Sequence, residues 1–402
     1  MIYVAVMGYG TVGGGVVEVL EKNKKEVAGK VGDEVGVKYI LDLRDFPGDP
    51  YEDKLIKDYS VIVNDPSVSI VVEAMGGTGA AYKFTKEALL NGKSVCTSNK
   101  ALVAQYGPEL MRIAEENNCS YLFEASVGGG IPIIRPLRTC FTAEHIESIT
   151  GILNGTTNYM LTKMNEEGCD YDDVLKEAQA KGYAEANPEA DVCGYDACRK
   201  IAILSSICFN KTVHFEEIKT EGITKICSVD FAYAAELGKS IKLLGHSREV
   251  GDKCLAITAP FMIGPECPLY SVKDVFNGIL VHGNMVDDVM FYGRGAGKLA
   301  TASAVVADVV ECAVNKGKNI QSAWEDGKCD MALDSDMQFK YFVRVKNDGL
   351  PELETNVKVN RIIKLKDFAE ETGVVTEITD EASFGKTMDV MGDKVLNYIR
   401  MM

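Results

Sequence analysis

Histidine is scarce in this sequence, and closely paired cysteines are missing. Only four of the 402 residues are histidines, and none stands in a motif that would match it to a nucleophilic cysteine. The chain has twelve cysteines, but no two are spaced as C-x-x-C, and several fall in predicted helices or strands. We therefore expect reduced thiols in a cytoplasmic protein rather than disulfides.

Long apolar runs and an excess of basic charge are missing as well. The longest mostly apolar stretch, residues 299–314, is too short to cross a bilayer and contains Asp308 and Glu311. The first ten residues lack the basic segment of a signal peptide, and they predict a folded start. With 43 basic and 59 acidic residues, the formal charge of -16 disfavours nucleic acid and membrane surfaces as partners. The net charge does not exclude a small-molecule substrate.

The first third of the chain alternates strand and helix patterns. Helical patterns fall at residues 16–23, 81–91 and 108–117. Short runs rich in β-branched residues predict strands at residues 2–6, 37–41, 69–73, 94–97 and 120–124. This alternation predicts an α/β fold, with a Rossmann-type doubly wound parallel sheet over residues 1–130.

The pattern changes from about residue 131. We expect a middle α+β domain at 131–297, a helix at 298–315 that packs back on the first domain, a polar linker at 316–336, and a small C-terminal α+β domain at 337–402. The expected strands are 146–153, 254–261 and 339–345. The expected helices are 171–180, 195–208 and 231–244, and prolines and glycines predict a loop at 260–270.

A glycine-rich turn, Gly8-Tyr-Gly-Thr-Val-Gly13, follows the first predicted strand and opens the first helix. In such a turn the backbone can approach a pyrophosphate, and the N–H groups of the helix N-terminus face the phosphates. The pattern G-x-G-x-x-G in this setting predicts dinucleotide binding. The second predicted strand ends at Asp42 and Arg44. An acidic residue here can bind the ribose 2′-OH of NAD and an arginine the 2′-phosphate of NADP, so the choice stays open.

Two further segments carry residues suited to catalysis. Lys100 follows a predicted strand, at the sheet edge where ligands bind in such folds. The preceding Cys96-Thr-Ser-Asn is similar to the nucleophilic segment of phosphorylating aldehyde dehydrogenases, which gives an alternative function. Asp196 and Lys200 share one face of a predicted helix that follows an acidic loop. They are either a surface ion pair or part of a site that binds an ammonium group and moves a proton.

Six segments resemble the homoserine dehydrogenase family in the family's order and spacing: 8–13, 97–100, 124–132, 151–161, 182–200 and 293–308. The most specific are Ala-Glu-Ala-Asn-Pro-Glu-Ala-Asp at 184–191 and Gly-Arg-Gly-Ala-Gly at 293–297. The resemblance covers residues 1 to about 315, and one departure is the absence of a proline just before Thr301. It implies NAD(P)-dependent interconversion of L-homoserine and L-aspartate 4-semialdehyde, a step in threonine, methionine and isoleucine biosynthesis.

The resemblance also implies roles for individual residues. Lys200 matches the catalytic proton carrier, and Lys100 its partner near cofactor and substrate. The implied substrate-binding residues are Asn154, Thr156, Gly182, Glu185, Asp191 and Asp196. The implied cofactor-binding residues are Gly8, Gly10, Thr11, Val12, Gly13, Arg44, Gly76, Ser98, Lys100, Gly182 and Gly297. A monovalent cation, usually sodium, would be held largely by backbone carbonyls of Glu124, Val127, Gly129 and Ile131.

The tail from about residue 337 is similar to the amino-acid-binding ACT module that many relatives carry. The usual Asp-x-Pro-Gly turn is absent, and Asn347-Asp-Gly-Leu-Pro351 stands in its place. The resemblance implies threonine as an effector and a homodimer or larger homo-oligomer formed through the middle domain. Two rival hypotheses remain: a semialdehyde dehydrogenase that uses Cys96, and a non-catalytic sensor of a dinucleotide and an amino acid.

Overall fold

The computed structural model describes residues 1–320, 324–325 and 327–402. The chain forms two compact units. The first unit comprises Met1–Glu144, Ala202–His214 and Gly293–Lys328, and the second comprises His145–Ile201, Phe215–Tyr292 and Cys329–Met402. Helix α10 (Tyr195–Cys208) supplies residues to both units.

The first unit is built on a parallel sheet of six strands in the order β3-β2-β1-β4-β5-β6. Every pairing in it is parallel, which confirms the predicted Rossmann-type sheet. Its strands are β1 (Ile2–Met7), β2 (Val35–Leu41), β3 (Leu55–Ile56), β4 (Val68–Glu73), β5 (Ser94–Thr97) and β6 (Tyr121–Leu122). The strand order reverses between β1 and β4, which places the ligand crevice at the carboxyl ends of these two strands.

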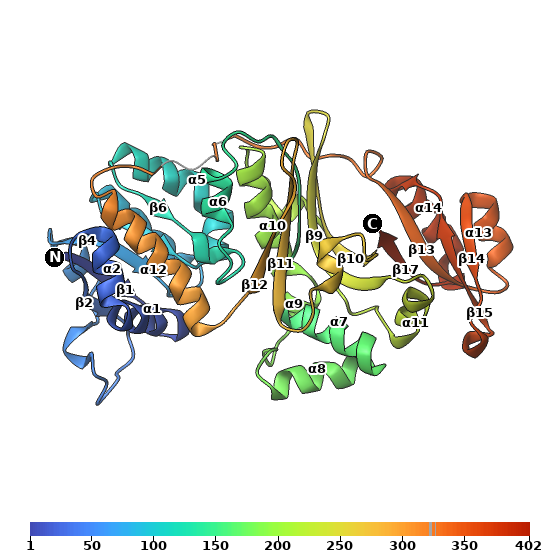
Figure 1. Ribbon diagram of the computed structural model, residues 1–402, viewed down its shortest axis with the longest axis horizontal. Coiled ribbons are helices and arrows are strands. Elements are labelled where there is room, and N and C mark those ends of the chain that lie inside the picture. The colour runs from blue at the N-terminus through green and yellow to red at the C-terminus, as the bar shows by residue number, and fades with distance from the viewer. Residues whose placement is uncertain (321–323, 326) are drawn as a thin grey trace. The chain divides into compact units, whose positions relative to one another are not determined.

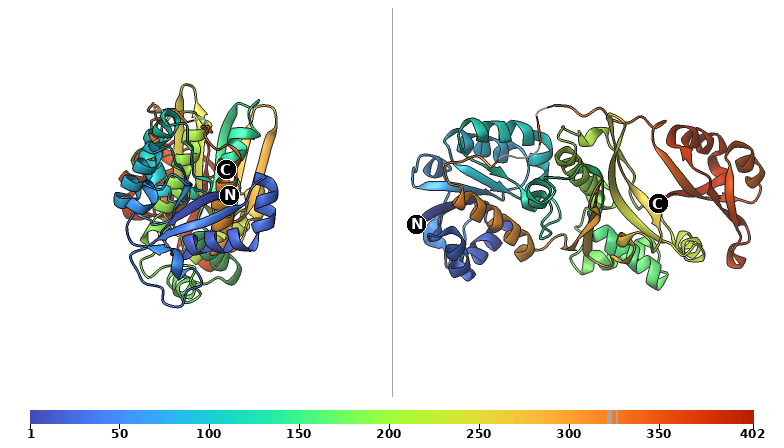
Figure 2. Two further views of the ribbon diagram at one scale, coloured as in Figure 1. Left: turned by 90° about the vertical axis from the view of Figure 1, so that its left-hand side faces the viewer. Right: turned by 45° about the horizontal axis from the view of Figure 1, so that its top comes forward.

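Helices cover both faces of this sheet, and α12 lies beside α1 and α2 while α5 lies on the opposite face (Figure 1, Figure 2). The helices are α1 (Thr11–Lys22), α2 (Lys24–Val31), α3 (Ser60–Val63), α4 (Gly79–Leu90), α5 (Lys100–Glu116), α6 (Ile134–Thr139) and α12 (Lys298–Val314). Short 3-10 helices occupy Glu52–Lys54 and Glu124–Ser126. Helix α5 begins eight residues before the predicted start at 108, because the Asn99 side chain caps it by accepting the N–H of Leu102, and Pro108 lies inside it.

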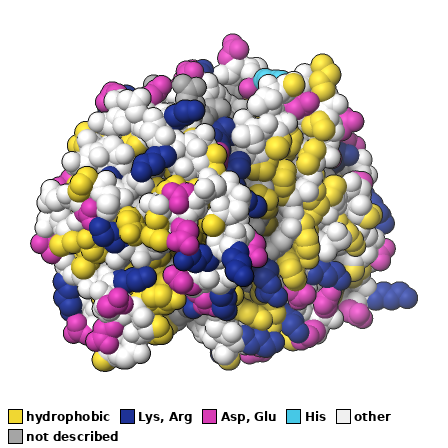
Figure 3. All heavy atoms as spheres, turned by 60° about the vertical axis from the view of Figure 1, so that its left-hand side comes forward, with side chains coloured by type: hydrophobic (Ala, Val, Ile, Leu, Met, Phe, Trp, Pro, Cys, Tyr) yellow, Lys and Arg dark blue, Asp and Glu magenta, His cyan; other side chains and the backbone are white. Residues whose placement is uncertain are grey.

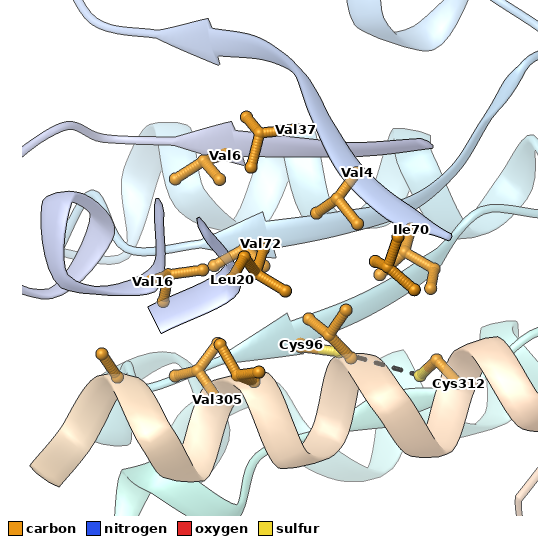
Figure 4. Packing of buried hydrophobic residues seen from close by; sticks show 14 of the residues in the cluster. Val4, Val6, Val16, Leu20, Val37, Ile70, Val72, Cys96, Val305 and Cys312 are labelled. Carbon is orange, nitrogen blue, oxygen red and sulfur yellow. Dashed lines mark hydrogen bonds between the residues drawn. The ribbon is translucent and has the colours of Figure 1, made fainter. Parts of the chain in front are cut away.

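The core between this sheet and α12 is aliphatic. Val4, Val6 and Val72 of the strands meet Val16 of α1 and Val305 of α12 (Figure 4). All five side chains are fully buried. Burial of this kind, at about 1.5–3 kcal/mol per aliphatic side chain, holds α12 on strands that lie much earlier in the chain.

The second unit contains most of a mixed sheet in the order β12-β11-β7-β9-β10-β17-β13-β15-β14. Its first strands are β7 (Ile146–Ile152), β8 (Lys219–Thr220), β9 (Ser240–Val250), β10 (Lys253–Ile263), β11 (Phe276–Gly283) and β12 (Asp287–Arg294). The helices that accompany them are α7 (Gly155–Glu167), α8 (Tyr171–Ala180), α9 (Glu189–Val192) and α11 (Ser228–Glu236), with 3-10 helices at Phe215–Glu217 and Pro268–Ser271.

Two predictions in this region are wrong. The helix expected at 231–244 ends at Glu236, because Gly238 adopts a left-handed φ of +67° and turns the chain into β9. The apolar residues from 240 on continue the helical spacing but belong to a strand. The loop expected at 260–270 begins only after Ile263, since Pro260 pairs with Leu243 of β9 in the middle of the β9–β10 ladder.

The C-terminal module, residues 337–402, has the topology β-α-β-β-α-β, with the two-residue strand β16 as an addition before the second helix. Its elements are β13 (Gln338–Lys346), α13 (Leu350–Asn356), β14 (Val359–Ile363), β15 (Glu371–Thr376), β16 (Thr379–Asp380), α14 (Glu381–Met391) and β17 (Val395–Met401), with 3-10 helices at Lys366–Phe368 and Gly392–Lys394. The antiparallel order β17-β13-β15-β14 is that of a ferredoxin-like fold, with α13 and α14 together on one face (Figure 2). Strand β17 also pairs in parallel with β10, so the module extends the sheet of the middle region.

Several described residues of the segment 316–336, where we expect a linker, are held by other parts of the fold. Trp324 is buried and its indole N–H donates to the Thr212 hydroxyl at 3.1 Å. Met331 forms a β-bridge with Cys254, and Cys329 is buried. Residues 321–323 and 326 of this segment lie outside the described residues. The polar composition of this segment therefore does not indicate which of its residues pair with residues far away in sequence.

The helices and the surface show how apolar and charged residues are distributed (Figure 3). Among the residues that the structure describes, no helix combines the length and the apolar character needed to traverse a bilayer. Basic and acidic side chains are interspersed over the face drawn in Figure 3.

Candidate active site

The glycine-rich turn between β1 and α1 requires glycine for steric reasons. Gly8 has a φ of +91°, and a methyl carbon added there would lie 2.6 Å from the carbonyl oxygen of Ala74. A methyl carbon on Gly13 would lie 1.8 Å from the carbonyl oxygen of Gly8. Gly10 stands immediately before the first helical residue, Thr11, and Val12 follows in the first turn. The turn therefore presents the N-terminus of α1, with its N–H groups, to a phosphate.

A pocket of about 590 Å³ opens beside this turn at the carboxyl ends of β1, β2 and β4. Its lining includes Gly8, Gly10, Asp42, Arg44, Lys57, Tyr59 and Phe84. A carboxylate, two cations and aromatic rings around a cavity of this size suit the adenosine end of a dinucleotide. Lys57, Tyr59 and Phe84 were not predicted as site residues, and for Lys57 the reason is that the two-residue strand β3 that leads to it has no strand pattern of its own.

Asp42 and Arg44 form a fork-shaped ion pair at the mouth of this pocket. Arg44 donates from Nε to Asp42 Oδ1 at 3.0 Å and from Nη2 to Oδ2 at 2.8 Å. Asp42 Oδ2 also accepts the N–H of Tyr9 at 2.8 Å. The hydrogen bonds from Arg44, aided by that backbone N–H, lower the pKa of Asp42 well below its ordinary value in spite of burial. Asp42 is therefore charged and already engaged, whereas Arg44 is largely exposed.

The next strand ends hold Gly76, Ser98 and Lys100. Lys100 is the first residue of α5, and Gly76 lies in the loop after β4 with a φ of +77°. Glu73, which the sequence analysis also missed, is fully buried here. It accepts the Thr97 hydroxyl at 2.6 Å and the Met75 N–H at 2.9 Å, and burial raises its pKa despite these bonds. Glu73 thus ties together the two loops that carry the predicted cofactor contacts.

The predicted cation loop is buried in the first unit. Gly128 and Gly129 have φ values of +73° and +56°, and Val127 and Ile131 are fully buried. The carboxylate of Glu124 accepts three backbone N–H groups, from Ile133, Ile134 and Arg135, at 2.6–2.9 Å. This carboxylate therefore caps α6, and any cation held by the loop would depend on backbone carbonyls instead.

Helix α12 is tied to the same loop. Asp308, 2% exposed, accepts the Glu124 N–H at 2.9 Å and the Arg135 guanidinium at 2.6 Å. Gly297 precedes the first helical residue with a φ of +130°. A methyl carbon on Gly129 would lie 2.4 Å from the carbonyl oxygen of Gly295. The glycine-rich segment 293–297 is thus packed directly on the predicted cation loop.

In the second unit, four of the predicted residues come together. The Asn154 amide donates to Asp191 Oδ1 at 2.7 Å and to Asp196 Oδ2 at 2.9 Å. Lys200 Nζ donates to Asp196 Oδ2 at 2.6 Å and to the Leu153 carbonyl at 2.8 Å. Both side chains of this ion pair are about nine-tenths buried, so it is no surface pair. Burial, and then the nearby Asp196, raise the pKa of Asp191, although Asn154 opposes the shift.

The other predicted substrate residues lie around this cluster. The Thr156 hydroxyl donates to the Tyr183 carbonyl at 2.6 Å, which joins α7 to the loop after α8. Gly182 lies in that loop with a φ of +72°. Glu185 is exposed, and the structure does not place its side chain in the cluster. Lys100 belongs to the first unit and Lys200 to the second.

Cys96 is part of the hydrophobic core. Its side chain has no exposed surface and points toward Cys312 of α12, with 3.7 Å between the two sulfur atoms (Figure 4). Burial raises the pKa of this thiol well above its ordinary value. A nucleophilic cysteine needs the thiolate and access to substrate, so the hypothesis of a dehydrogenase that uses Cys96 is wrong. All twelve cysteines are free thiols, as predicted.

Comparisons with known proteins agree on one family. Residues 8–124 match the model "Homoserine dehydrogenase, NAD binding domain", and residues 132–310 match the model "Homoserine dehydrogenase". A homoserine dehydrogenase of Synechocystis sp. is 45% identical over 319 residues, which cover 77% of this chain and 72% of that protein. The crystal structure of a homoserine dehydrogenase from Thiobacillus denitrificans has a TM-score of 0.91 at 34% identity and covers 100% of this chain and 98% of its own. A hyperthermophilic archaeal homoserine dehydrogenase in complex with NADPH has a TM-score of 0.67 at 27% identity, and covers 80% of this chain and 99% of its own.

Proposed function

Because this chain belongs to the homoserine dehydrogenase family, we propose that it interconverts L-homoserine and L-aspartate 4-semialdehyde, with Lys200 as the proton carrier. The observation that carries the proposal is the buried cluster of Asn154, Asp191, Asp196 and Lys200. A bound nicotinamide would take up or give the hydride. The chain supplies orientation, charge and the proton.

The chemistry of each side chain in the cluster suits it to a different role. Asp191 and Asp196 place two carboxylates where the substrate ammonium group can bind, since a buried cation needs such partners. An ammonium group has three N–H donors, and the bonds of Lys200 to Leu153 and Asp196 fix its direction. In the reductive direction the ammonium form of Lys200 donates a proton to the semialdehyde oxygen and becomes the neutral amine, and in the oxidative direction the neutral amine accepts the hydroxyl proton of homoserine. Lys100 is the second cation proposed for this reaction.

The experiment that tests this proposal is the change in nicotinamide absorbance with homoserine and either NAD or NADP. A change in absorbance that depends on homoserine would support the proposed reaction. A protein that binds dinucleotide and homoserine without turnover would instead be the sensor considered above, and would overturn the proposal.

We further propose that NADP(H) is the preferred cofactor. Two cations, Arg44 and Lys57, line the pocket, and the Arg44 side chain is 62% exposed. The Asp42 side chain is only 8% exposed, and both of its oxygens already accept hydrogen bonds. A 2′-phosphate could therefore be shared by two exposed cations, of which Arg44 pairs with Asp42 and Lys57 with Asp45, whereas a ribose 2′-OH would compete with Tyr9 and Arg44 for Asp42.

The remaining proposals concern an ion and an effector. The backbone of the loop at Glu124, Val127, Gly129 and Ile131 suits a sodium ion, since two successive glycines with positive φ redirect its carbonyls within a buried segment. Thermal unfolding in sodium chloride and in choline chloride would show whether the ion stabilises the fold. The ferredoxin-like topology of the C-terminal module fits an ACT-like module with threonine as effector, which isothermal titration of the full-length protein would test.

We also propose a homo-oligomer in the cytoplasm. Strand β12 ends the larger sheet, and Tyr292 on it is 56% exposed, so this edge can receive a second copy. Light scattering coupled to size exclusion would give the assembly size. Twelve free thiols suit the reducing conditions of the cytoplasm.

A further inference from the structure

We propose that Arg400 and Glu221 are positioning residues for the substrate site, through which the C-terminal module holds the turn that carries Asp191 and Asp196. This inference rests on the proposed function of those two carboxylates. It concerns contacts within the second unit only.

The first link is a buried fork between the module and the middle region. Arg400, near the end of β17, has a side chain that is 1% exposed. Its Nη1 donates to Glu221 Oε2 at 2.9 Å and its Nη2 to Oε1 at 2.8 Å. Two parallel charge-assisted bonds fix the orientation of a carboxylate more tightly than one bond can. Arg400 therefore determines where Glu221 lies.

The module in turn fixes Arg400 from its other side. Glu381, at the start of α14, accepts Arg400 Nε at 3.0 Å, and its carboxylate also pairs with Lys219 at 2.7 Å. Tyr341 of β13 donates its hydroxyl to the same carboxylate. Burial favours the neutral acid, but Arg400, Lys219 and Tyr341 outweigh it and lower the pKa of Glu381 to about 2. The Arg400 guanidinium is thus held between two carboxylates, that of Glu381 in the C-terminal module and that of Glu221 in the middle region.

The second link runs along the backbone from Glu221 to the acidic turn. The Glu221 N–H donates to the Thr258 carbonyl of β10 at 2.7 Å. At the next residue, Gly222, a methyl carbon would lie only 2.0 Å from the Val192 carbonyl oxygen and 2.5 Å from Cys193 Cα. The Ile223 N–H donates to that same Val192 carbonyl at 2.8 Å. The chain that follows Glu221 is therefore in direct backbone contact with the turn between α9 and α10.

The third link is the turn itself. Gly194 joins α9 to α10 with a φ of +83°, and a methyl carbon on it would meet Thr220 Cγ2 at 3.2 Å and the Glu221 carbonyl oxygen at 3.3 Å. Asp191 lies three residues before Gly194 and Asp196 two residues after it. We expect a displacement of Glu221 to be passed through these backbone contacts to both carboxylates, which Asn154 holds together. Because misplacement of substrate-binding groups by about 1 Å costs orders of magnitude in rate, this contact matters for the reaction.

The chain offers a matched control in Arg344. This second buried arginine of the module donates to Asp230 Oδ1 of α11 at 3.0 Å and to Glu371 Oε2 at 2.8 Å. It joins the same two regions with the same kind of ion pair, but its partners lie on α11 and β15 and not beside the acidic turn. Loss of Arg344 should therefore affect stability without a selective effect on substrate binding.

The test compares Glu221→Gln, Arg400→Lys and Arg344→Lys with the wild type in full-length protein, by the KM of homoserine, the KM of the nicotinamide cofactor, kcat and thermal unfolding. We expect Glu221→Gln and Arg400→Lys to raise the KM of homoserine on the order of 5- to 20-fold, with the cofactor KM unchanged. Arg344→Lys should lower the unfolding temperature and leave the homoserine KM within about twofold of the wild type.

Two results would overturn the inference while the proposed function stands: a wild-type homoserine KM in both Glu221→Gln and Arg400→Lys, or an equal rise in Arg344→Lys. A wild type with no homoserine-dependent turnover would instead remove the proposed function, and the inference with it. Arg400→Lys keeps the charge and loses the fork, so it reports on the geometry even if a more drastic change does not fold.

Discussion

Lys200 Nζ lies 2.6 Å from Asp196 Oδ2, one helical turn away on α10, and the same ammonium group donates to the carbonyl of Leu153, the residue that follows β7. These two bonds come from a helix and from a strand end, so they hold the amine in one direction. Substitution Lys200→Met should therefore lower kcat by about 100-fold or more, which is the range of lost acid–base catalysis.

Steady-state kinetics with homoserine checks this prediction, and Lys176→Met on the exposed face of α8 is a control that should keep full activity. Near-normal turnover in Lys200→Met would assign the proton to another group.

The elements that could be predicted from the sequence are those that depend on residues close together along the chain. Five of the six strands of the first sheet, the glycine turn, α8 and α10 follow from patterns within some ten residues, whereas the two-residue β3 was not predicted. Asp191, Asp196 and Lys200 of the cluster were predicted because they lie close together in one specific segment, and Asn154 because its own segment resembles the family. Lys57, Glu73, Glu221 and Arg400 were missed because each acquires its role from a partner that is far away in sequence. The false helix at 231–244 has a different, local origin, since Gly238 turns the chain from α11 into β9 although the apolar residues on both sides continue the helical spacing.

Cofactor preference should depend on the two cations of the pocket. In Arg44→Ala and Lys57→Ala, the KM of NADPH should rise about tenfold, because each variant removes a partner of the 2′-phosphate, and the KM of NADH should change little. Lys54→Ala is the control, since this residue lies in the same stretch of chain but outside the pocket lining. An equal rise for both cofactors would show that these cations bind a part that NAD and NADP share.

The buried thiol of Cys96 should be dispensable for the reaction. Cys96→Ala removes only a sulfur atom from the core, so kcat should stay within about twofold of the wild type and the unfolding temperature should fall slightly. Cys312→Ala, which removes the facing sulfur, should have the same effect. Complete loss of turnover in a folded Cys96→Ala variant would contradict this prediction and would support Cys96 as a nucleophile.

The free energy of unfolding at acid pH should depend on the charge of the Glu381 carboxylate. Its pKa falls from an ordinary value of 4.5 to about 2, against the effect of burial, because Arg400, Lys219 and Tyr341 stabilise the charged form. A carboxylate whose pKa is lower in the folded state stabilises the fold fully above its ordinary pKa, and that stabilisation is lost as the pH falls from about 4.5 toward 2. A shift of this size corresponds to at most about 3 kcal/mol.

Urea unfolding of the wild type and Glu381→Gln at pH 7 and pH 3 measures this contribution. The wild type should be the more stable protein at pH 7, and the difference should shrink at pH 3, where part of the Glu381 carboxylate is protonated in the folded state and nearly all of it in the unfolded state. Glu354→Gln on the exposed face of α13 should leave stability unchanged at both values. A difference of the same size at pH 7 and pH 3 would mean that Glu381 acts through packing alone, because a shape effect does not titrate.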